Sequence, residues 1–233
     1  MSSNTESNDY RLERWLAFLL SLLFFLPFVA RADDIAFTGS FHGEDMPYVD
    51  GEEFLALDRQ GILVPVRIGV SIEEDMIVDE RGEKTGKSVS VAGFEEVFLL
   101  RGPKLHPGKT TKARPDFAEL LPSTWKSTFT LGTDEYDVSY RCGESECALV
   151  LAHGELSQDL VTIEIVREGR EVNTLDIAHV VHFAGDLDHD GRLDLIADLS
   201  RHWNESRPTL WLSSAAKDGQ LVGMTAELST TGC

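Results

Sequence analysis

Four aspartates are concentrated in one short stretch of the chain, GDLDHDGRLDLIADLS, residues 185–200. Within nine consecutive residues lie Asp186, Asp188, Asp190 and Asp194. Calcium takes about six to eight oxygen ligands, and carboxylates at alternate positions around a tight turn supply most of them. Gly191 permits the reversal of the backbone, and Arg192 would then offer its carbonyl oxygen. The side chains of Leu187 and His189 would point outward, so the spacing predicts a cage for a hard cation.

The alternative interpretation of the same run is an acidic turn exposed to solvent. Asp-Gly turns are common and need no metal. However, two carboxylates about 4 Å apart repel each other by on the order of 4 kcal/mol at an effective dielectric constant near 20. Arg192 alone offers too little counter-charge for four of them. Repulsion and the preference for oxygen ligands favour Ca²⁺, whereas Mg²⁺ is less suited because it requires strict octahedral geometry.

The run also resembles the D-x-D-x-D-G-x-x-D calcium loop of FG-GAP and VCBS-type repeats, which occur in integrin-like β-propellers. In those repeats a glycine precedes the loop and a leucine-rich strand follows it, as Gly185 and Leu195 do here. The resemblance implies four side-chain ligands and the Arg192 carbonyl as the metal site: Asp186, Asp188, Asp190 and Asp194. The motif occurs once, so a propeller does not follow. The loop is not an EF-hand either, because its twelfth position is Ala197 instead of a glutamate.

The segments around this loop resemble short strands separated by turns. Residues 62–72 alternate apolar side chains with others at a period of two, and similar short runs resume at residue 128. The pattern predicts an all-β fold, an antiparallel sandwich or barrel-like meander with one strand–calcium loop–strand unit. Residues 116–121 are the exception. With Asp116 as a cap and Pro122 as a stop, they predict a short helix.

The N-terminal segment has the pattern of a signal peptide. Arg11 and Arg14 precede an apolar run over residues 15–30, and Ala30-Arg31-Ala32 supplies the small-x-small pattern of a cleavage site. The run is short for a membrane span, which needs about 20 apolar residues, although an uncleaved anchor is the alternative. We therefore expect a signal peptide over 1–32 and a periplasmic or secreted protein with no membrane association after its removal.

Three further segments follow the signal peptide in this interpretation. An N-terminal β unit covers 33–101, a linker with the short helix covers 102–127, and a C-terminal β unit with the calcium loop covers 128–233. The two β units alternatively form one domain. The net charge of −19 excludes nucleic acid and anionic lipid as partners and favours attraction of divalent cations.

Two of the three cysteines are placed for a disulfide. Cys142 and Cys147 flank a four-residue loop between strand-like segments, and such a hairpin brings them within bonding distance. A bond from either residue to Cys233 is the alternative. A two-thiolate zinc site would need two more ligands, and none occurs at a suitable spacing.

Histidines and nucleophiles suggest no catalytic centre. His179 and His182 are three apart in a strand-like segment, so they face opposite sides and are interpreted as ordinary surface or loop histidines. The chain has no nucleophile elbow and no phosphate-binding loop. The sequence thus favours an exported, calcium-binding, non-catalytic β-rich structural or binding module, whose partner is an unknown protein or carbohydrate. The alternatives are a carbohydrate-type hydrolase with structural calcium and a carbohydrate- or small-ligand-binding protein.

Overall fold

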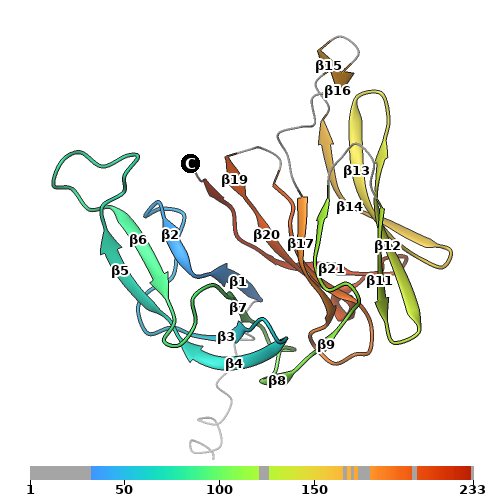
Figure 1. Ribbon diagram of the computed structural model, residues 1–233, viewed down its shortest axis with the longest axis horizontal. Coiled ribbons are helices and arrows are strands. Elements are labelled where there is room, and N and C mark those ends of the chain that lie inside the picture. Colours follow the sequence, from blue (N-terminus) through green and yellow to red (C-terminus); the bar gives the residue numbers. More distant parts are fainter. Residues whose placement is uncertain are drawn as a thin grey trace, which may run out of the picture. The chain divides into compact units, whose positions relative to one another are not determined.

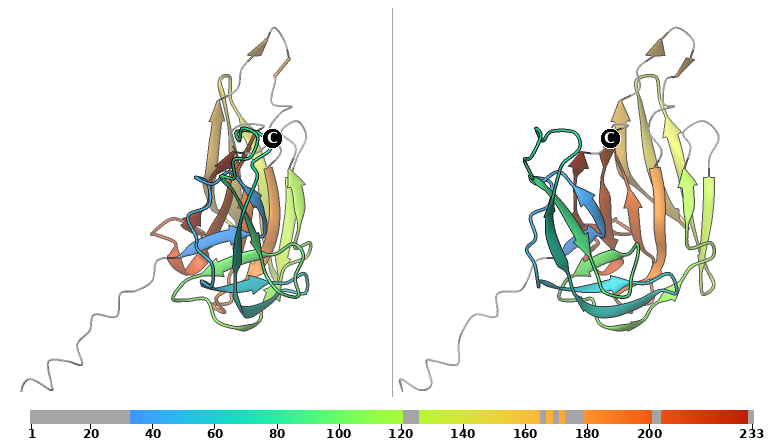
Figure 2. Two further views of the ribbon diagram at one scale, coloured as in Figure 1. Left: turned by 90° about the vertical axis from the view of Figure 1, so that its left-hand side faces the viewer. Right: turned by 60° about the vertical axis from the view of Figure 1, so that its left-hand side comes forward.

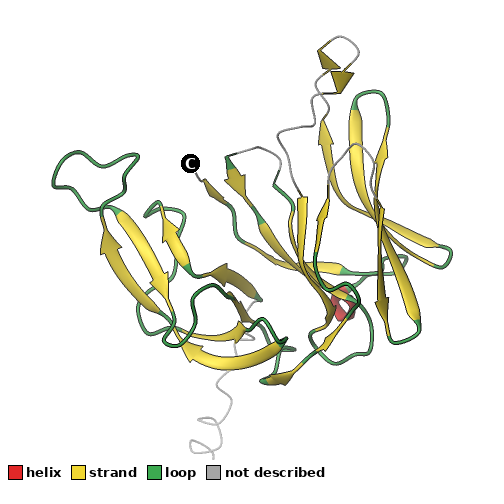
Figure 3. Ribbon diagram, in the orientation of Figure 1, coloured by secondary structure: helices red, strands yellow, loops and turns green. Residues whose placement is uncertain are grey.

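The computed structural model describes residues 33–120, 126–164, 167–168, 171–172, 179–200 and 204–231. The expected signal peptide and Cys233 lie outside these residues. Among those described, every regular element is a β-strand except one short 3-10 helix, η1 (Ser213–Ala215) (Figure 3). The all-β class and the antiparallel pairing expected from the sequence are therefore confirmed. No described helix is long and apolar enough to span a membrane.

A central antiparallel sheet contains the acidic loop. Its strands, in spatial order, are β10 (Ala118–Leu120), β17 (His179–Asp186), β18 (Asp194–Asp198), β20 (Pro208–Leu212) and β21 (Gly223–Glu227). A short strand, β9 (Thr111–Lys112), pairs with the end of β17 next to the loop. The four strands β17, β18, β20 and β21 follow one another in space almost as they do along the chain, so hairpin-like connections build most of this sheet.

Other sheets flank the central one (Figures 1 and 2). One flanking sheet has the order β1 (Asp34–Phe37), β7 (Phe98–Arg101), β3 (Glu53–Leu57), β4 (Ile62–Arg67) and β8 (Gly108–Lys109). Beside it lies a sheet of β2 (Gly39–Phe41), β6 (Gly86–Ser90) and β5 (Gly69–Glu73). The other flank is a meander of β11 (Lys126–Leu131), β12 (Asp134–Cys142), β13 (Glu146–His153) and β14 (Leu156–Glu164). Two-stranded pairs complete the set, β15 (Arg167–Glu168) with β16 (Glu171–Val172) and β19 (Glu205–Ser206) with β22 (Thr230–Thr231).

The central sheet is buried on both faces. Leu195 and Ala197 of β18 belong to a hydrophobic cluster with residues of the β11–β14 meander, such as Phe129. Ile196, between them, belongs to a second cluster with residues of the β1 sheet, such as Leu99. Successive side chains of a strand point to opposite faces, so a strand covered on both sides needs apolar residues at every position. This burial explains the uninterrupted apolar runs of β18 and β20, and the stacked sheets correspond to the sandwich alternative.

Two local expectations were wrong. The short helix expected over 116–121 is not found in the described part of that range, 116–120, where Ala118–Leu120 instead form β10, which pairs with β17. Prolines at 115 and 122 leave too few residues for a stable helix, and pairing with the central sheet satisfies the same backbone groups. The alternating run 62–72 is also not one strand. It breaks at Ile68 into β4 and β5, which belong to different sheets.

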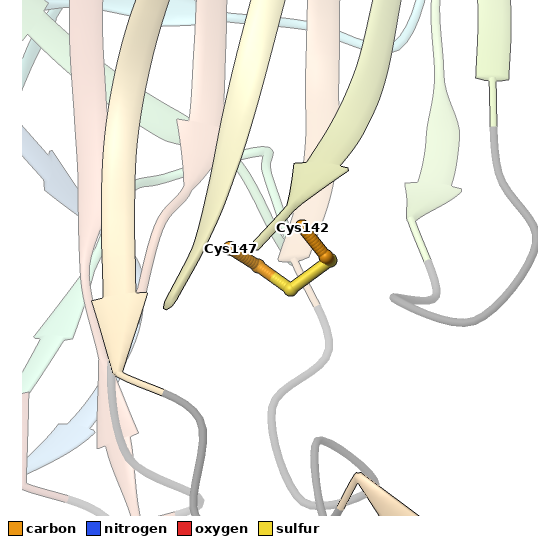
Figure 4. Close-up of a disulfide and its surroundings, with 2 residues drawn as sticks. All are labelled: Cys142 and Cys147. Carbon is orange, nitrogen blue, oxygen red and sulfur yellow. A yellow bond between two sulfur atoms is a disulfide. The ribbon is translucent and has the colours of Figure 1, made fainter. Parts of the chain in front are cut away.

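A disulfide joins Cys142 and Cys147, as the sequence predicted (Figure 4). The two residues are direct partners in the β12–β13 pairing, with their Cα atoms 3.9 Å apart. Cys147 is fully buried against the central sheet, whereas Cys142 is exposed. The bond therefore closes one end of the meander.

An ion pair between His42 and Asp75 fixes the loop between β5 and β6. Asp75, at the start of this loop, is buried and bonds to the Nδ1 atom of His42, which follows β2. The other carboxylate oxygen of Asp75 accepts the backbone N–H of Ile77 at 3.0 Å. The hydrogen bond with Asp75 raises the pKa of His42, and the hydrogen bond with His42 lowers the pKa of Asp75. His42 therefore keeps its proton to a higher pH than a free imidazole does, and Asp75 keeps its charge to a lower pH than a free carboxylate does.

This ion pair predicts a pH-dependent contribution to stability. The contribution of His42 is present below its unfolded pKa of about 6.5 and is lost as pH rises through the raised folded pKa. The contribution of Asp75 is present above about 3.9 and is lost as pH falls through its lowered folded pKa. His42→Gln should therefore lower the melting temperature more at about pH 5.5 than at about pH 8.5. Thermal unfolding of both proteins at the two pH values measures the difference, and equal losses would contradict the pairing.

Candidate metal centre

The acidic loop connects two neighbouring strands of the central sheet. β17 ends at Asp186 and β18 begins at Asp194, and Gly185 pairs with Asp194 across the two strands. Inside the loop, Gly191 and His189 adopt left-handed backbone conformations, with φ of 82° and 64°. Such conformations reverse the chain over a few residues. The strand ends and this reversal bring aspartates from both sides of the loop together.

Three of the four aspartates converge. Asp186, Asp188 and Asp194 each offer a carboxylate oxygen, and these three atoms lie within 4.8 Å of one another. Two oxygens that bind the same calcium ion at about 2.4 Å lie at most about 5 Å apart. The triad therefore has the dimensions of a site that can hold a metal ion.

Asp194 is the most rigidly held member of the triad. It is fully buried, and its Oδ2 atom accepts the backbone N–H groups of Leu187 at 2.7 Å and Asp188 at 3.3 Å. Its Oδ1 atom accepts the N–H and the hydroxyl of Ser213, at 2.7 and 3.0 Å. Burial, with a further contribution from the negative charge of Asp188, raises the pKa of Asp194 to about 7. A nearby cation would lower the cost of keeping this carboxylate ionised.

Asp186 carries an oxygen that no described group satisfies. Its Oδ2 atom accepts the backbone N–H of Gly191 at 3.1 Å. Its Oδ1 atom is buried and has no hydrogen-bond partner within the described ranges. The residue is only 7% exposed, so water has little access to this oxygen. An unsatisfied buried polar atom costs free energy, and for a charged group the cost is larger. The orphaned oxygen therefore marks the place where a cation would be bound.

Asp190 and Arg192 are placed differently from the other expected ligands. The Asp190 carboxylate pairs with the Arg192 guanidinium, with Nη2 2.7 Å from Oδ2, and also accepts the Ser213 hydroxyl at 2.8 Å. Asp190 thus neutralises Arg192 and lies outside the converging triad. The roles of the Asp190 carboxylate and the Arg192 carbonyl as ligands stay predictions.

Two serines that the sequence analysis did not consider complete the surroundings of the loop. Ser213 donates to Asp190 and Asp194, and the Ser214 hydroxyl donates to Asp188. Both serines begin η1, directly after β20 of the central sheet. They lie 19 to 26 residues from the aspartates along the chain, so no local pattern pointed to them.

The apolar residues of the loop anchor it to the core. The Leu187 side chain was expected to point outward from the loop. It is instead fully buried in the cluster shared with the β1 sheet. Leu193 is buried in the cluster on the opposite side. Gly185, before the loop, has no room for a side chain, because a Cβ atom there would clash with the backbone oxygen of Thr111 in β9. The triad is therefore fixed from both faces of the sheet.

The fold and this site define a class: an all-β protein whose central sheet carries an acidic triad that can hold a metal ion. Comparisons of the chain with protein families, with curated proteins and with solved structures find no match. The likeness to FG-GAP and VCBS-type loops therefore rests on the residues of the loop alone.

Proposed function

We propose that the loop between β17 and β18 binds calcium, and that the ion is a structural part of an exported, non-catalytic binding or structural module. The orphaned Oδ1 atom of Asp186, buried within the triad, carries this proposal. All side-chain donors are carboxylate oxygens, which suit a hard cation and not zinc or copper. Their irregular arrangement around a turn suits the flexible coordination of calcium better than the octahedron of magnesium.

The position of the loop supports a structural role for the ion. It joins two strands of the sheet that both hydrophobic clusters share, so ordering the loop orders the centre of the fold. The disulfide supports export, because such bonds persist in oxidising compartments. The N-terminal signal pattern and the acidic composition agree with a periplasmic or secreted protein. Its partner would be a protein or a carbohydrate.

Calorimetric titration of the chelator-treated protein tests calcium binding directly. We expect one saturable site with a dissociation constant of roughly 10⁻⁴ to 10⁻³ M or tighter, and weaker binding of magnesium. Asp188→Asn should weaken calcium binding at least about tenfold, because it removes one of three converging charges. The matched control is Asp134→Asn, at the exposed turn between β11 and β12, which should bind calcium as the wild type does. Equal loss in both variants, or no saturable binding, would contradict the proposal.

A further inference from the structure

A cavity of about 590 Å³ lies between the central sheet and the flanking sheet of β1, β7 and β3. Its volume is in the range of about 300–1,000 Å³ that small-molecule sites occupy. Three phenylalanine rings and three other apolar side chains form much of its wall: Phe37, Leu57, Val97, Phe98, Phe183 and Pro208. The cavity is separate from the acidic triad, none of whose residues lines it.

A β-bulge places a histidine in this cavity. The pairing of β17 with β18 shifts its register between Val181 and Phe183, so His182 is the extra residue. Val181 packs toward the β11–β14 meander and Phe183 toward the β1 sheet, which breaks the strict alternation of the strand. His182 and Phe183 therefore both line the cavity. The His182 ring lies 5.0 Å from the ring centroid of Phe98, inclined by 54°.

This position differs from the ordinary surface or loop histidine expected from the sequence. Burial lowers the pKa of His182, against an opposing effect of the Asp198 charge, and so favours the neutral imidazole. A neutral imidazole offers one hydrogen-bond donor and one acceptor. No hydrogen bond to its ring nitrogens is found within the part of the chain that the structure describes. The cavity therefore has a polar group available beside its aromatic wall.

The two cationic side chains of the cavity wall are already paired. Lys112 forms an ion pair with Asp116, and the guanidinium of Arg59 lies 4.0 Å from Glu96. These four charges cancel, and all four residues line the cavity.

Two further carboxylates of the wall have no cationic partner within 4.0 Å among the described residues. Asp58 accepts two backbone N–H groups, at 2.9 and 2.7 Å. Asp198 accepts the Ser206 hydroxyl at 2.8 Å and the backbone N–H groups of Ser200 and Arg207 at 3.0 and 2.9 Å. These neutral donors fix the carboxylates in place but leave their charge uncompensated. The wall therefore carries a formal excess of two negative charges.

We propose that this cavity binds a small organic ammonium ion, with its apolar body against the apolar wall and its cationic head between the phenylalanine rings and Asp198. Aromatic faces attract ammonium groups, and the attraction increases when the group is desolvated. The uncompensated carboxylates add a second attraction, and they repel carboxylate or phosphate ligands. The net charge of −19 also raises the concentration of cations near the protein, which favours binding of an ammonium ion.

Two probes of similar size and opposite charge test this inference on the wild-type protein. 2-Phenylethylammonium and 3-phenylpropanoate share the phenyl ring and differ in the charge of the head. NMR titration should show the ammonium probe binding at least about tenfold more tightly, and it should shift the ring resonances of His182. Equal or reversed affinities, or binding that leaves the His182 resonances unmoved, would overturn the proposal.

Two variants locate the binding. Phe98→Leu keeps the wall apolar but removes an aromatic face, so it should weaken the ammonium probe by about threefold or more. Its matched control is Phe117→Leu, at an exposed phenylalanine outside the cavity, which should leave the affinity unchanged. Asp198→Asn should reduce the preference for the ammonium probe over the carboxylate probe, with circular dichroism to verify that the fold is kept. A Phe98→Leu protein that binds as well as the control would contradict the assigned site.

Discussion

Calcium at millimolar concentration is expected to raise the melting temperature of the wild-type protein, and Asp186→Ala is expected to abolish this rise. A ligand that binds only the folded state adds about 2.7 kcal/mol of stability at one hundred times its dissociation constant, and below about 1 kcal/mol when the two are equal. For a protein of this size the larger value corresponds to about 5–10 °C. Calorimetric scans with calcium and with chelator measure the difference.

The same substitution should act in the opposite direction in chelator. Without calcium, the buried Oδ1 atom of Asp186 has no partner among the described residues and lies close to two other carboxylates. Asp186→Ala removes this oxygen and the repulsion, at the cost of one hydrogen bond from Gly191. We therefore expect a higher melting temperature for the variant than for the wild type in chelator, and a lower one in calcium. This reversal of sign distinguishes a metal site from a solvated acidic turn.

Two neighbouring substitutions serve as controls. His189 is exposed, and its side chain is not among the described hydrogen-bond partners of the triad, so His189→Ala should keep the calcium-dependent rise. Asp190→Ala breaks the pairing with Arg192 and Ser213 and should lower stability in both conditions, without the reversal. A melting temperature that responds to neither calcium nor chelator, in the wild type and all variants, would leave only the acidic turn.

The convergence of the triad was predictable because its determinants are local. A hairpin brings residues at both ends of a short loop together, and a glycine with positive φ supplies the reversal. The spacing in the sequence does not distinguish the four aspartates, however, and it does not predict the direction in which Asp190 points. That carboxylate turns toward Arg192 and Ser213, and Ser213 is positioned by β20, a strand that joins the site only through the pairing of the whole sheet.

The cavity was not predictable for a related reason. The expectation that His179 and His182 face opposite sides assumed an unbroken period of two along β17. The bulge at His182 changes the phase of the strand, and no residue type in the run marks it. The short helix failed likewise, because the partner of Ala118–Leu120 is β17, about 60 residues further along the chain. Periodicity identifies strands, but pairing between distant segments decides registers and faces.

Leu187 connects the acidic loop to the hydrophobic core, so its truncation should affect stability. The residue lies between two members of the triad, yet its side chain is fully buried in the cluster that packs against the β1 sheet. Its backbone N–H also donates to Asp194 at 2.7 Å, so the same residue joins the metal loop to the core. Leu187→Ala should therefore lower the free energy of unfolding by about 2–5 kcal/mol, as expected for truncation of a buried leucine.

Urea unfolding in chelator and in calcium measures this loss. Leu187→Met, which nearly conserves the volume, should cost less than about 1.5 kcal/mol. His189→Ala, two residues along the same loop, should change stability by no more than about 0.5 kcal/mol. Calcium binding to Leu187→Ala should also weaken, because a loop that has lost its anchor holds Asp188 and Asp194 less firmly. If Leu187→Ala lowered the free energy of unfolding no more than His189→Ala does, the loop would be a surface turn independent of the core. Calcium binding to the loop would then not stabilise the central sheet.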